Sequence, residues 1–291
     1  MFKKQSALIY SFIKIQLIET ISIFDTSKTI IMTKSKRTAL VCGSTQGIGF
    51  SVAQKFAKNG FDVILLARNE AKLNAALEHL DVSLGQQHQL LVADFSQPND
   101  LESVMDKFLQ NGKKIHVLIN NTGGPKGGLI KDAAPEEFIQ TFNQHLICNH
   151  ILMQAVTPGM IEAGFGRIIN IISTSVKQPL PNLGVSNTIR GAVANWSKTL
   201  AGELGQFGIT VNNVLPGATN TSRLTEIAGA KSLKTGQSVS EIFEEMGGET
   251  PMKRIAEPEE VAAAVYFLAS EEASYINGIN LPVDGGRTKC L

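Results

Sequence analysis

Seven short, mostly apolar runs that begin at residue 38 are the feature that most restricts the fold of this chain. They occupy Thr38–Cys42, Val63–Ala67, Gln89–Ala93, Val117–Asn120, Arg167–Ile172, Thr210–Leu215 and Ile279–Val283. Such runs are typical of parallel strands that are buried on both faces. Between them apolar residues recur at helical spacing, as in Ile48, Val52 and Phe56. The alternation predicts an α/β fold with βαβ units and a doubly wound, parallel, seven-stranded sheet.

A single domain is expected over residues 37–291. The chain of 291 residues is within the range that one α/β domain with an open sheet reaches, and it shows no internal repeat and no low-complexity segment. One stretch, from about residue 217 to 257, has no clear periodicity and holds five glycines between a strand and a helix. Long irregular segments inside compact domains are often lids, so a lid is predicted here.

Residues 1–36 differ in composition from the rest of the chain. Lys3 and Lys4 precede a short apolar stretch that Lys14 interrupts, and no run is long enough to span a bilayer. A small-residue cleavage site of the kind that ends a signal peptide does not follow. Met32 opens a polar lead directly before the first strand. This segment is therefore expected to be an N-terminal extension that is either disordered or not translated.

Charge and cysteine usage indicate a cytoplasmic protein that acts on a small molecule. The 27 Lys and Arg residues nearly cancel the 26 Asp and Glu residues, so no long-range field favours nucleic acid or a membrane as partner. Cys42, Cys148 and Cys290 are far apart and show no metal-binding spacing. Neither a disulfide framework nor a metal site is predicted, and a reducing compartment is the simplest interpretation.

A glycine-rich loop joins the first strand directly to a helix. Glycine allows a tight turn there and lets backbone N–H groups approach a pyrophosphate at the positive end of the helix dipole. A tight turn without a ligand would use the same residues, but the strand and helix on either side favour a Rossmann-type dinucleotide site. The loop consists of Gly43, Ser44, Thr45, Gln46, Gly47, Ile48 and Gly49.

The end of the second strand indicates which dinucleotide binds. An acidic residue there would bind the ribose 2′-hydroxyl of NAD(H), whereas an arginine accommodates the 2′-phosphate of NADP(H). The sequence has Ala67 and Arg68 at this point. NADP(H) is therefore favoured over NAD(H), although Gln46 supplies no second positive charge in the glycine loop. The alternative is that Arg68 is a solvated surface residue.

These residues, together with further motifs, resemble the short-chain dehydrogenase/reductase family, and within it the 3-oxoacyl-carrier-protein reductase-like branch. The resemblance covers about residues 37–287 and implies a seven-stranded sheet and a homo-oligomer, usually a tetramer, with a dimer as the alternative. The further motifs are Asn120-Asn121-Thr122-Gly123, Ser173, Pro216-Gly217 and Val283-Asp284-Gly285-Gly286.

The resemblance also implies a set of cofactor contacts. The glycine loop with Ile48 would hold the pyrophosphate, and Arg68 the 2′-phosphate. Asp94 and Phe95 would contact the adenine, although Asp94 is also a typical turn residue. Asn121 would lie by the adjoining ribose or would fix a loop. Pro216, Gly217, Thr219 and Thr221 would lie near the nicotinamide carboxamide.

The predicted active site departs from the family pattern. The family uses an Asn, a Ser that polarises the carbonyl, a Tyr that donates the proton, and a Lys that holds the ribose and lowers the pKa of the Tyr. Ser173 matches the Ser, but Ser186 stands at the Tyr position, Arg190 at the Lys position and His145 at the Asn position. A serine hydroxyl is a far poorer acid than a phenol with a pKa near ~10. Arg190 can still donate hydrogen bonds to ribose hydroxyls.

His145 has two interpretations. The unperturbed pKa of a histidine, near ~6.5, suits acid/base chemistry, whereas a lone histidine on a helix is usually structural. The leading hypothesis is an NADP(H)-dependent oxidoreductase with a carbonyl or alcohol substrate, in which Ser173, Ser186 and a water held by His145 or Asn149 supply the proton. The alternative is a catalytically weak or inactive dinucleotide-binding sensor or partner subunit, which the loss of Tyr and Lys favours.

Apolar residues in the predicted lid indicate a substrate with an apolar part, unless they are ordinary packing residues. The sequence names neither the substrate nor the direction of the reaction. These lid residues are Leu224, Ile227, Ile242, Phe243 and Met246.

Overall fold

Seven parallel strands form one sheet in the order β3-β2-β1-β4-β5-β6-β7. The computed structural model describes residues 36–110 and 112–290, so the predicted extension over residues 1–36 lies outside them except for its last residue. Each strand begins and ends within one residue of the run expected from the sequence, so the predicted doubly wound sheet is confirmed. The strands are β1 (Thr38–Cys42), β2 (Asp62–Ala67), β3 (Gln89–Val92), β4 (Val117–Asn120), β5 (Gly166–Ile171), β6 (Ile209–Pro216) and β7 (Asn280–Val283).

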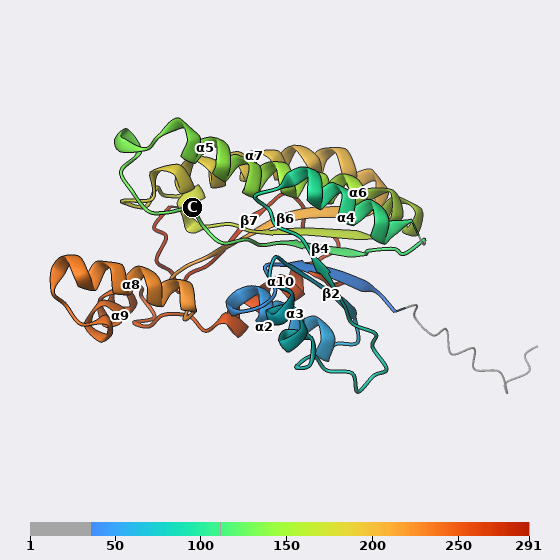
Figure 1. The fold of residues 1–291 in the computed structure, drawn as a ribbon, viewed down its shortest axis with the longest axis horizontal. Helices are drawn as coiled ribbons and strands as arrows, with labels where there is room; N and C mark the ends of the chain where they lie inside the picture. The colour runs from blue at the N-terminus through green and yellow to red at the C-terminus, as the bar shows by residue number, and fades with distance from the viewer. Residues whose placement is uncertain (1–35, 111, 291) are drawn as a thin grey trace, which may run out of the picture. The chain divides into compact units, whose positions relative to one another are not determined.

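Helices cover both faces of this sheet (Figure 1). One layer consists of α2 (Gly47–Lys58), α3 (Glu70–Leu77) and α10 (Pro258–Ala269). The other consists of α4 (Pro98–Leu109), α6 (Cys148–Ala163) and α7 (Gly184–Leu204), with α5 (Pro135–Phe142) joined to α6 by a π-helical turn, η2 (Asn143–Ile147). Short 3₁₀ turns are η1 (Ile130–Asp132), η3 (Thr174–Val176) and η4 (Gly205–Phe207).

An apolar core fills the space between the sheet and each helical layer. Phe56 of α2 is fully buried in one core, and Leu152 of α6 is fully buried in the other. This arrangement explains why the strands are apolar on both faces. No helix within the described ranges is both long and apolar enough to cross a membrane.

The segment predicted as an irregular lid holds two helices, α8 (Ser222–Thr235) and α9 (Val239–Gly248), and the expectation of irregular structure is wrong. Capping explains both helices, because Thr221 caps α8 and Ser238 forms a capping box with Glu241 at the start of α9. Ala228 is the one buried residue of α8, which is why its apolar periodicity is weak. Figure 1 shows the pair beside the carboxyl ends of the strands.

A row of asparagine side chains crosses β4, β5, β6 and β7. Asn120, Asn170, Asn213 and Asn280 are register partners on successive strands. The Nδ2 of each of the first three donates to the Oδ1 of the next, over 2.8, 3.0 and 2.8 Å in turn. Ser197 of α7 accepts from Asn170 (2.9 Å) and donates to Asn213 (2.8 Å). A one-residue slip of any of these strands would separate buried amides from their partners, so the row specifies the register.

Replacing Asn170 with alanine should therefore lower the free energy of unfolding by about 3 kcal/mol, because three buried polar groups lose a partner. Urea unfolding measures this loss. The matched control is Asn195→Ala on the exposed face of α7, which should change stability by less than about 0.5 kcal/mol. An equal effect of the two changes would contradict the role given to the row.

Candidate active site

A cavity of about 480 Å³ opens at the carboxyl ends of β1, β2, β3 and β4. The sheet is extended from β1 in two opposite directions: β2 and β3 lie on one side of β1, and β4 to β7 lie on the other side. Ligands of open α/β sheets bind at such a switch point. The predicted cofactor residues that line the cavity are Gly43, Gln46, Arg68, Asp94, Phe95 and Asn121, together with Thr45 of the glycine loop.

The glycine loop is held in a tight conformation that requires its glycines. Gly43 and Gly47 have φ angles of 57° and 55°, which other residues rarely adopt. A Cβ atom on Gly49 would lie 2.2 Å from the carbonyl oxygen of Gly43. The Nδ2 of Asn121 donates to the carbonyls of Cys42 (3.2 Å) and Gly43 (3.3 Å), so Asn121 fixes the loop as well as lining the cavity.

The N-terminus of α2 is suited to an anion. The side chain of Gln46 makes no cap hydrogen bond, and the first turn contains no acidic residue. Free N–H groups at the positive end of a helix bind phosphate. Ile48 packs against the apolar core, and Ser44 is buried beneath the loop with a hydroxyl that has no partner among the described residues. These residues therefore fit the pyrophosphate of a dinucleotide.

A second cation lines the cavity to which Arg68 contributes. It is Lys72, in the first turn of α3, and Asn69 lines the cavity as well. The Oδ1 of Asn69 accepts from the N–H of Lys72 (2.9 Å) and so caps the helix. Lys72 is not among the residues predicted from the sequence. Its signal is its place in the first turn of the helix that begins directly after Arg68 and Asn69.

Asp94 and Phe95 lie at the end of β3. The carboxylate of Asp94 accepts from the N–H of Ser96 (2.9 Å), which is a turn contact, and Asp94 also lines the cavity. Phe95 is 8% exposed, and its carbonyl accepts from the thiol of Cys148 (3.3 Å). The turn role and the expected cofactor role of Asp94 are thus compatible.

The residues predicted near the nicotinamide lie outside the lining of this cavity. Pro216 ends β6, and the N–H of Gly217 donates to the carbonyl of Val283 (2.9 Å). Thr219 is buried and donates its hydroxyl proton to the carbonyl of Gly217 (3.1 Å). Thr221 caps α8. Their contacts with a cofactor remain predictions.

Ser173 and Ser186 lie on neighbouring elements. Ser173 precedes η3, and its Oγ accepts from the N–H of Ser175 (3.1 Å). Ser186 lies in the first turn of α7, which packs against η3. Both side chains are half-buried. The structure therefore brings the two predicted hydroxyl groups to the same side of the sheet.

Arg190 lies inside the protein. Its Nη1 donates to the carbonyl of Ile171 at the end of β5 (3.0 Å), and burial lowers its pKa to about 10. The guanidinium therefore keeps its charge at neutral pH. Arg190 is outside the lining of the cavity, and its predicted bond to the ribose remains a prediction.

His145 lies in the π-helical turn and is 2% exposed. Burial lowers its pKa to about 2, and the nearby charge of Arg190 acts in the same direction, while a hydrogen bond with the backbone of Gly123 opposes them. Its Nε2 has no hydrogen-bond partner among the described residues. The expectation that this pKa lies near ~6.5 is therefore corrected, and the imidazole is neutral at physiological pH. Asn149, one turn further along in α6, is also buried.

The fold and the cavity together define a Rossmann-type dinucleotide-binding protein. A family model described as enoyl-(acyl carrier protein) reductase matches residues 43–288. The chain belongs to the short-chain dehydrogenase/reductase family. Within residues 36–110 and 112–290, no group of His, Cys, Asp or Glu residues is placed to hold a metal ion.

Relatives align with the described domain over nearly their whole length. The NADPH-dependent reductase BacG of Bacillus subtilis is 32% identical over 88% of this chain and 100% of its own. The 3-oxoacyl-[acyl-carrier-protein] reductase FabG of Haemophilus influenzae is 33% identical over 85% of this chain and 96% of its own. The structure of L-sorbose reductase from Gluconobacter frateurii with NADPH and L-sorbose superposes with a TM-score of 0.83, at 31% identity, over 88% of this chain and 98% of that one.

The depressed pKa of His145 should make stability depend on pH. Between about pH 2 and the unfolded value near ~6.5, the unfolded chain binds a proton at this histidine that the folded protein does not. Stability should therefore fall as the pH is lowered through this window. From pH 7 to pH 5 the wild type should lose ~2 kcal/mol that a His145→Gln variant does not lose.

Urea unfolding at the two pH values measures this difference. His79→Gln, at an exposed position after α3, is the matched control and should retain the pH dependence of the wild type. If His145→Gln and the wild type lose the same stability, then His145 is protonated in the folded protein.

Proposed function

We propose that this protein is an NADP(H)-dependent oxidoreductase that reduces a carbonyl group or oxidises the corresponding alcohol, with an atypical proton donor. The observation that carries the proposal is a single cavity that combines the uncapped N-terminus of α2 with Arg68 and Lys72. The first feature suits a pyrophosphate, and the two cations suit a 2′-phosphate. The names of BacG and of the L-sorbose reductase complex, which both include NADPH, support the same cofactor.

The chain's own residues would position the reaction and deliver the proton. The bound nicotinamide supplies or accepts the hydride. Ser173 would polarise the substrate carbonyl with its hydroxyl, and Ser186 would pass a proton to the carbonyl oxygen and regain one from water. Arg190 keeps its charge at neutral pH and so releases no proton, and neutral His145 could orient a water but not act as a cationic acid. The net source of the proton is then the solvent.

One observation favours the second candidate, a catalytically weak or inactive dinucleotide sensor or partner subunit. Among the residues that the structure describes, no tyrosine replaces the missing proton donor: Tyr266 packs edge-on against Phe56 in the core between the sheet and α2, and Tyr275 is fully exposed. A fluorescence titration with NADPH, followed by an assay of its oxidation with ketones, 3-oxoacyl thioesters and quinones, separates the two functions. Binding without turnover on any substrate would favour the sensor.

We further propose a cytoplasmic homo-oligomer, a tetramer or a dimer. Large apolar side chains are exposed on two separate elements, Ile139 (62%) on α5 and Phe267 (45%) on α10. Apolar side chains exposed in this way are suited to contacts between copies. The three cysteines of the chain are free thiols, which is compatible with a reducing compartment. Sedimentation equilibrium measures the mass, and a monomer at micromolar concentration would contradict the oligomer.

Arg68→Asp should weaken the binding of NADPH by about 10- to 100-fold, because it removes a charged hydrogen-bond donor and places a carboxylate beside the 2′-phosphate. Binding of NADH should be unchanged or improved. The control is Lys58→Asp, which makes the same change in charge at the other end of α2 and should leave both affinities unchanged. If the wild type binds NADH more tightly than NADPH, the assignment of Arg68 is wrong.

Restoring the Tyr and the Lys of the family pattern at positions 186 and 190 should raise turnover. The double variant Ser186→Tyr, Arg190→Lys introduces a phenol and a nearby ammonium that favours its phenolate, and it should raise kcat for a ketone by ~100-fold. The matched control is Ser186→Phe, Arg190→Lys, which has the same ring without the hydroxyl. A similar gain in both variants would show that packing, and not proton transfer, causes the change.

A further inference from the structure

A second cavity, of about 360 Å³, lies beside the segment that follows Ser173. One wall is the loop from η3 to α7, beginning with Thr174, which is the chain neighbour of Ser173. The opposite wall is the C-terminal segment 287–289 together with the residue that ends α9. Within the described ranges the two cavities share no lining residue. The second cavity is therefore separate from the dinucleotide cavity and adjoins the serine proposed to bind the substrate carbonyl.

The C-terminal segment is folded back toward the loop between η3 and α7. The carboxylate of Asp284 accepts from the N–H groups of Gly286 (3.0 Å) and Thr288 (2.8 Å), which makes a turn directly after β7. Further along, the thiol of Cys290 donates to the carbonyl of Lys177 (3.4 Å). The turn and this contact hold the segment against the loop, so the residues between them line the cavity.

The charges in the lining favour an anion. The lining contains two cations, Arg287 and Lys289, and one carboxylate, Glu249. The guanidinium of Arg287 is paired with this carboxylate (2.5 Å). The exposed ammonium of Lys289 has no ion pair or hydrogen bond with any residue that the structure describes. One positive charge in the cavity is therefore uncompensated.

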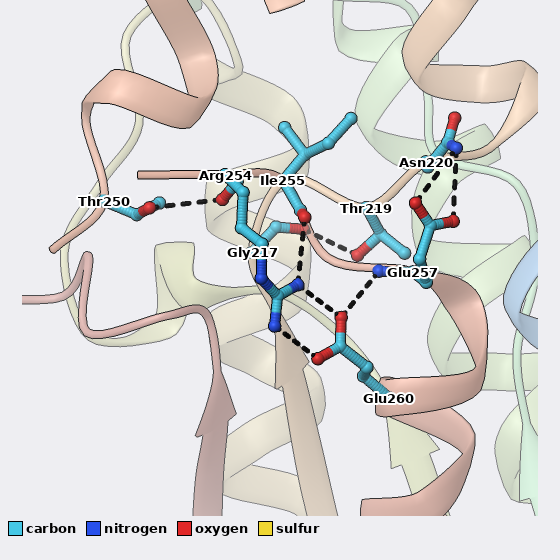
Figure 2. A network of polar contacts seen from close by, with 8 residues as sticks. All are labelled: Gly217, Thr219, Asn220, Thr250, Arg254, Ile255, Glu257 and Glu260. Carbon is cyan, nitrogen blue, oxygen red and sulfur yellow. Dashed lines mark hydrogen bonds and ion pairs between the residues drawn. The ribbon is translucent and has the colours of Figure 1, made fainter. Parts of the chain in front are cut away.

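The wall that carries Glu249 is held in place by its neighbours. The hydroxyl of Thr250, which is buried, is shared between the carbonyls of Gly247 (2.9 Å) and Arg254 (3.2 Å). The guanidinium of Arg254 in turn donates to both carboxylate oxygens of Glu260, at 2.6 and 2.7 Å (Figure 2). Two-bond pairs of this kind are strong. The charge of Arg254 is thus compensated, which leaves Lys289 as the cation that a ligand of the second cavity can engage.

Neutral residues complete the lining. Thr174, Gln178 and Thr288 carry groups that can donate a hydrogen bond to an oxygen atom. Leu180, between two prolines, supplies an apolar part. The lining therefore suits a short carbon chain that ends in an acceptor with negative charge.

We propose that Lys289 binds a carboxylate of the substrate, so that the protein prefers a ketone that carries a carboxylate, or the corresponding hydroxy acid. This inference rests on the proposed function, because it places the carbonyl at Ser173 and the carboxylate in the adjoining cavity. A carboxylate accepts hydrogen bonds and carries a full charge, and pairs of two ionised groups are stronger than neutral ones. Lys289 determines specificity and takes no part in the transfer of the hydride or the proton.

Matched acids and amides test the inference on the full-length protein. 4-Oxopentanoate and 5-oxohexanoate are each compared with their neutral primary amide, which has nearly the same shape. With NADPH, the wild type should show a higher kcat/KM for each acid than for its amide. Lys289→Gln should lower kcat/KM for the acids by about fivefold, through KM, and change the values for the amides by less than about twofold. Added salt should weaken the preference of the wild type, because Lys289 is exposed.

Two further variants give the expected signs. Glu249→Gln removes the carboxylate from the lining and releases Arg287, so it should strengthen the preference for the acids by roughly threefold. Lys107→Gln, at an exposed position of α4, is the matched control for the loss of a lysine and should change nothing. Isothermal titration calorimetry of the same acids and amides with the complex of protein and NADP⁺ measures the preference independently of turnover.

The remaining outcomes overturn the inference. If the wild type binds and reduces acids and amides equally well, or if its complex with NADP⁺ binds neither acid, the cavity does not select a carboxylate. If Lys289→Gln keeps the full preference for the acids, then Lys289 is not the residue that binds them. A protein that does not bind NADPH contradicts the proposed function, and titration of the acids and amides without cofactor then decides the role of Lys289 separately.

Discussion

The hydrogen-bonded row of asparagines across β4 to β7 is the constraint on which the site depends. Asn121 follows directly after the member of the row in β4, and Ser173 lies three residues beyond the member in β5. The row therefore determines where along the strands, and on which face of the sheet, Asn121 and Ser173 lie, the two residues whose roles at the site are predicted. A sheet with apolar side chains alone would tolerate a shift in strand register more easily. A displaced apolar side chain costs less free energy than a buried amide that has lost its hydrogen-bond partner.

Much of the fold follows from the sequence because its signals are local. Buried parallel strands are apolar on both faces, and the glycine loop requires glycines wherever φ is positive, so both could be predicted. Helices α8 and α9 could not, because α8 buries little more than Ala228 and depends on caps such as Thr221. Lys72 could not be predicted for a similar reason. Its place in the cavity lining depends on how the start of α3 lies relative to the end of β2.

The charge state of His145 depends on contacts between distant segments of the chain. The pKa of His145 is set by burial, by Arg190 of another helix and by the backbone of Gly123. None of these three effects on the pKa of His145 can be predicted from the residue types alone. Because the guanidinium stays charged, it favours a neutral imidazole beside it, so the pair holds a single positive charge. The family resemblance predicts both residues for the active site, but only the packed structure shows that the positive charge of this pair lies on Arg190.

The π-helical turn between α5 and α6 has a consequence for how this chain can change. Such a turn holds one residue more than an α-helical turn, so Asn143–Ile147 is equivalent to a single-residue insertion in an otherwise continuous helix. The wide turn absorbs the extra residue, so α5 and α6 keep the relative facing of one continuous helix. Deleting one residue within the turn would restore a regular helix and leave α5 facing nearly the same way, whereas a deletion from the regular part of α5 would rotate the residues before it by ~100°. The π-helical turn is therefore the place where a change in the length of this helix disturbs the packing of α5 least.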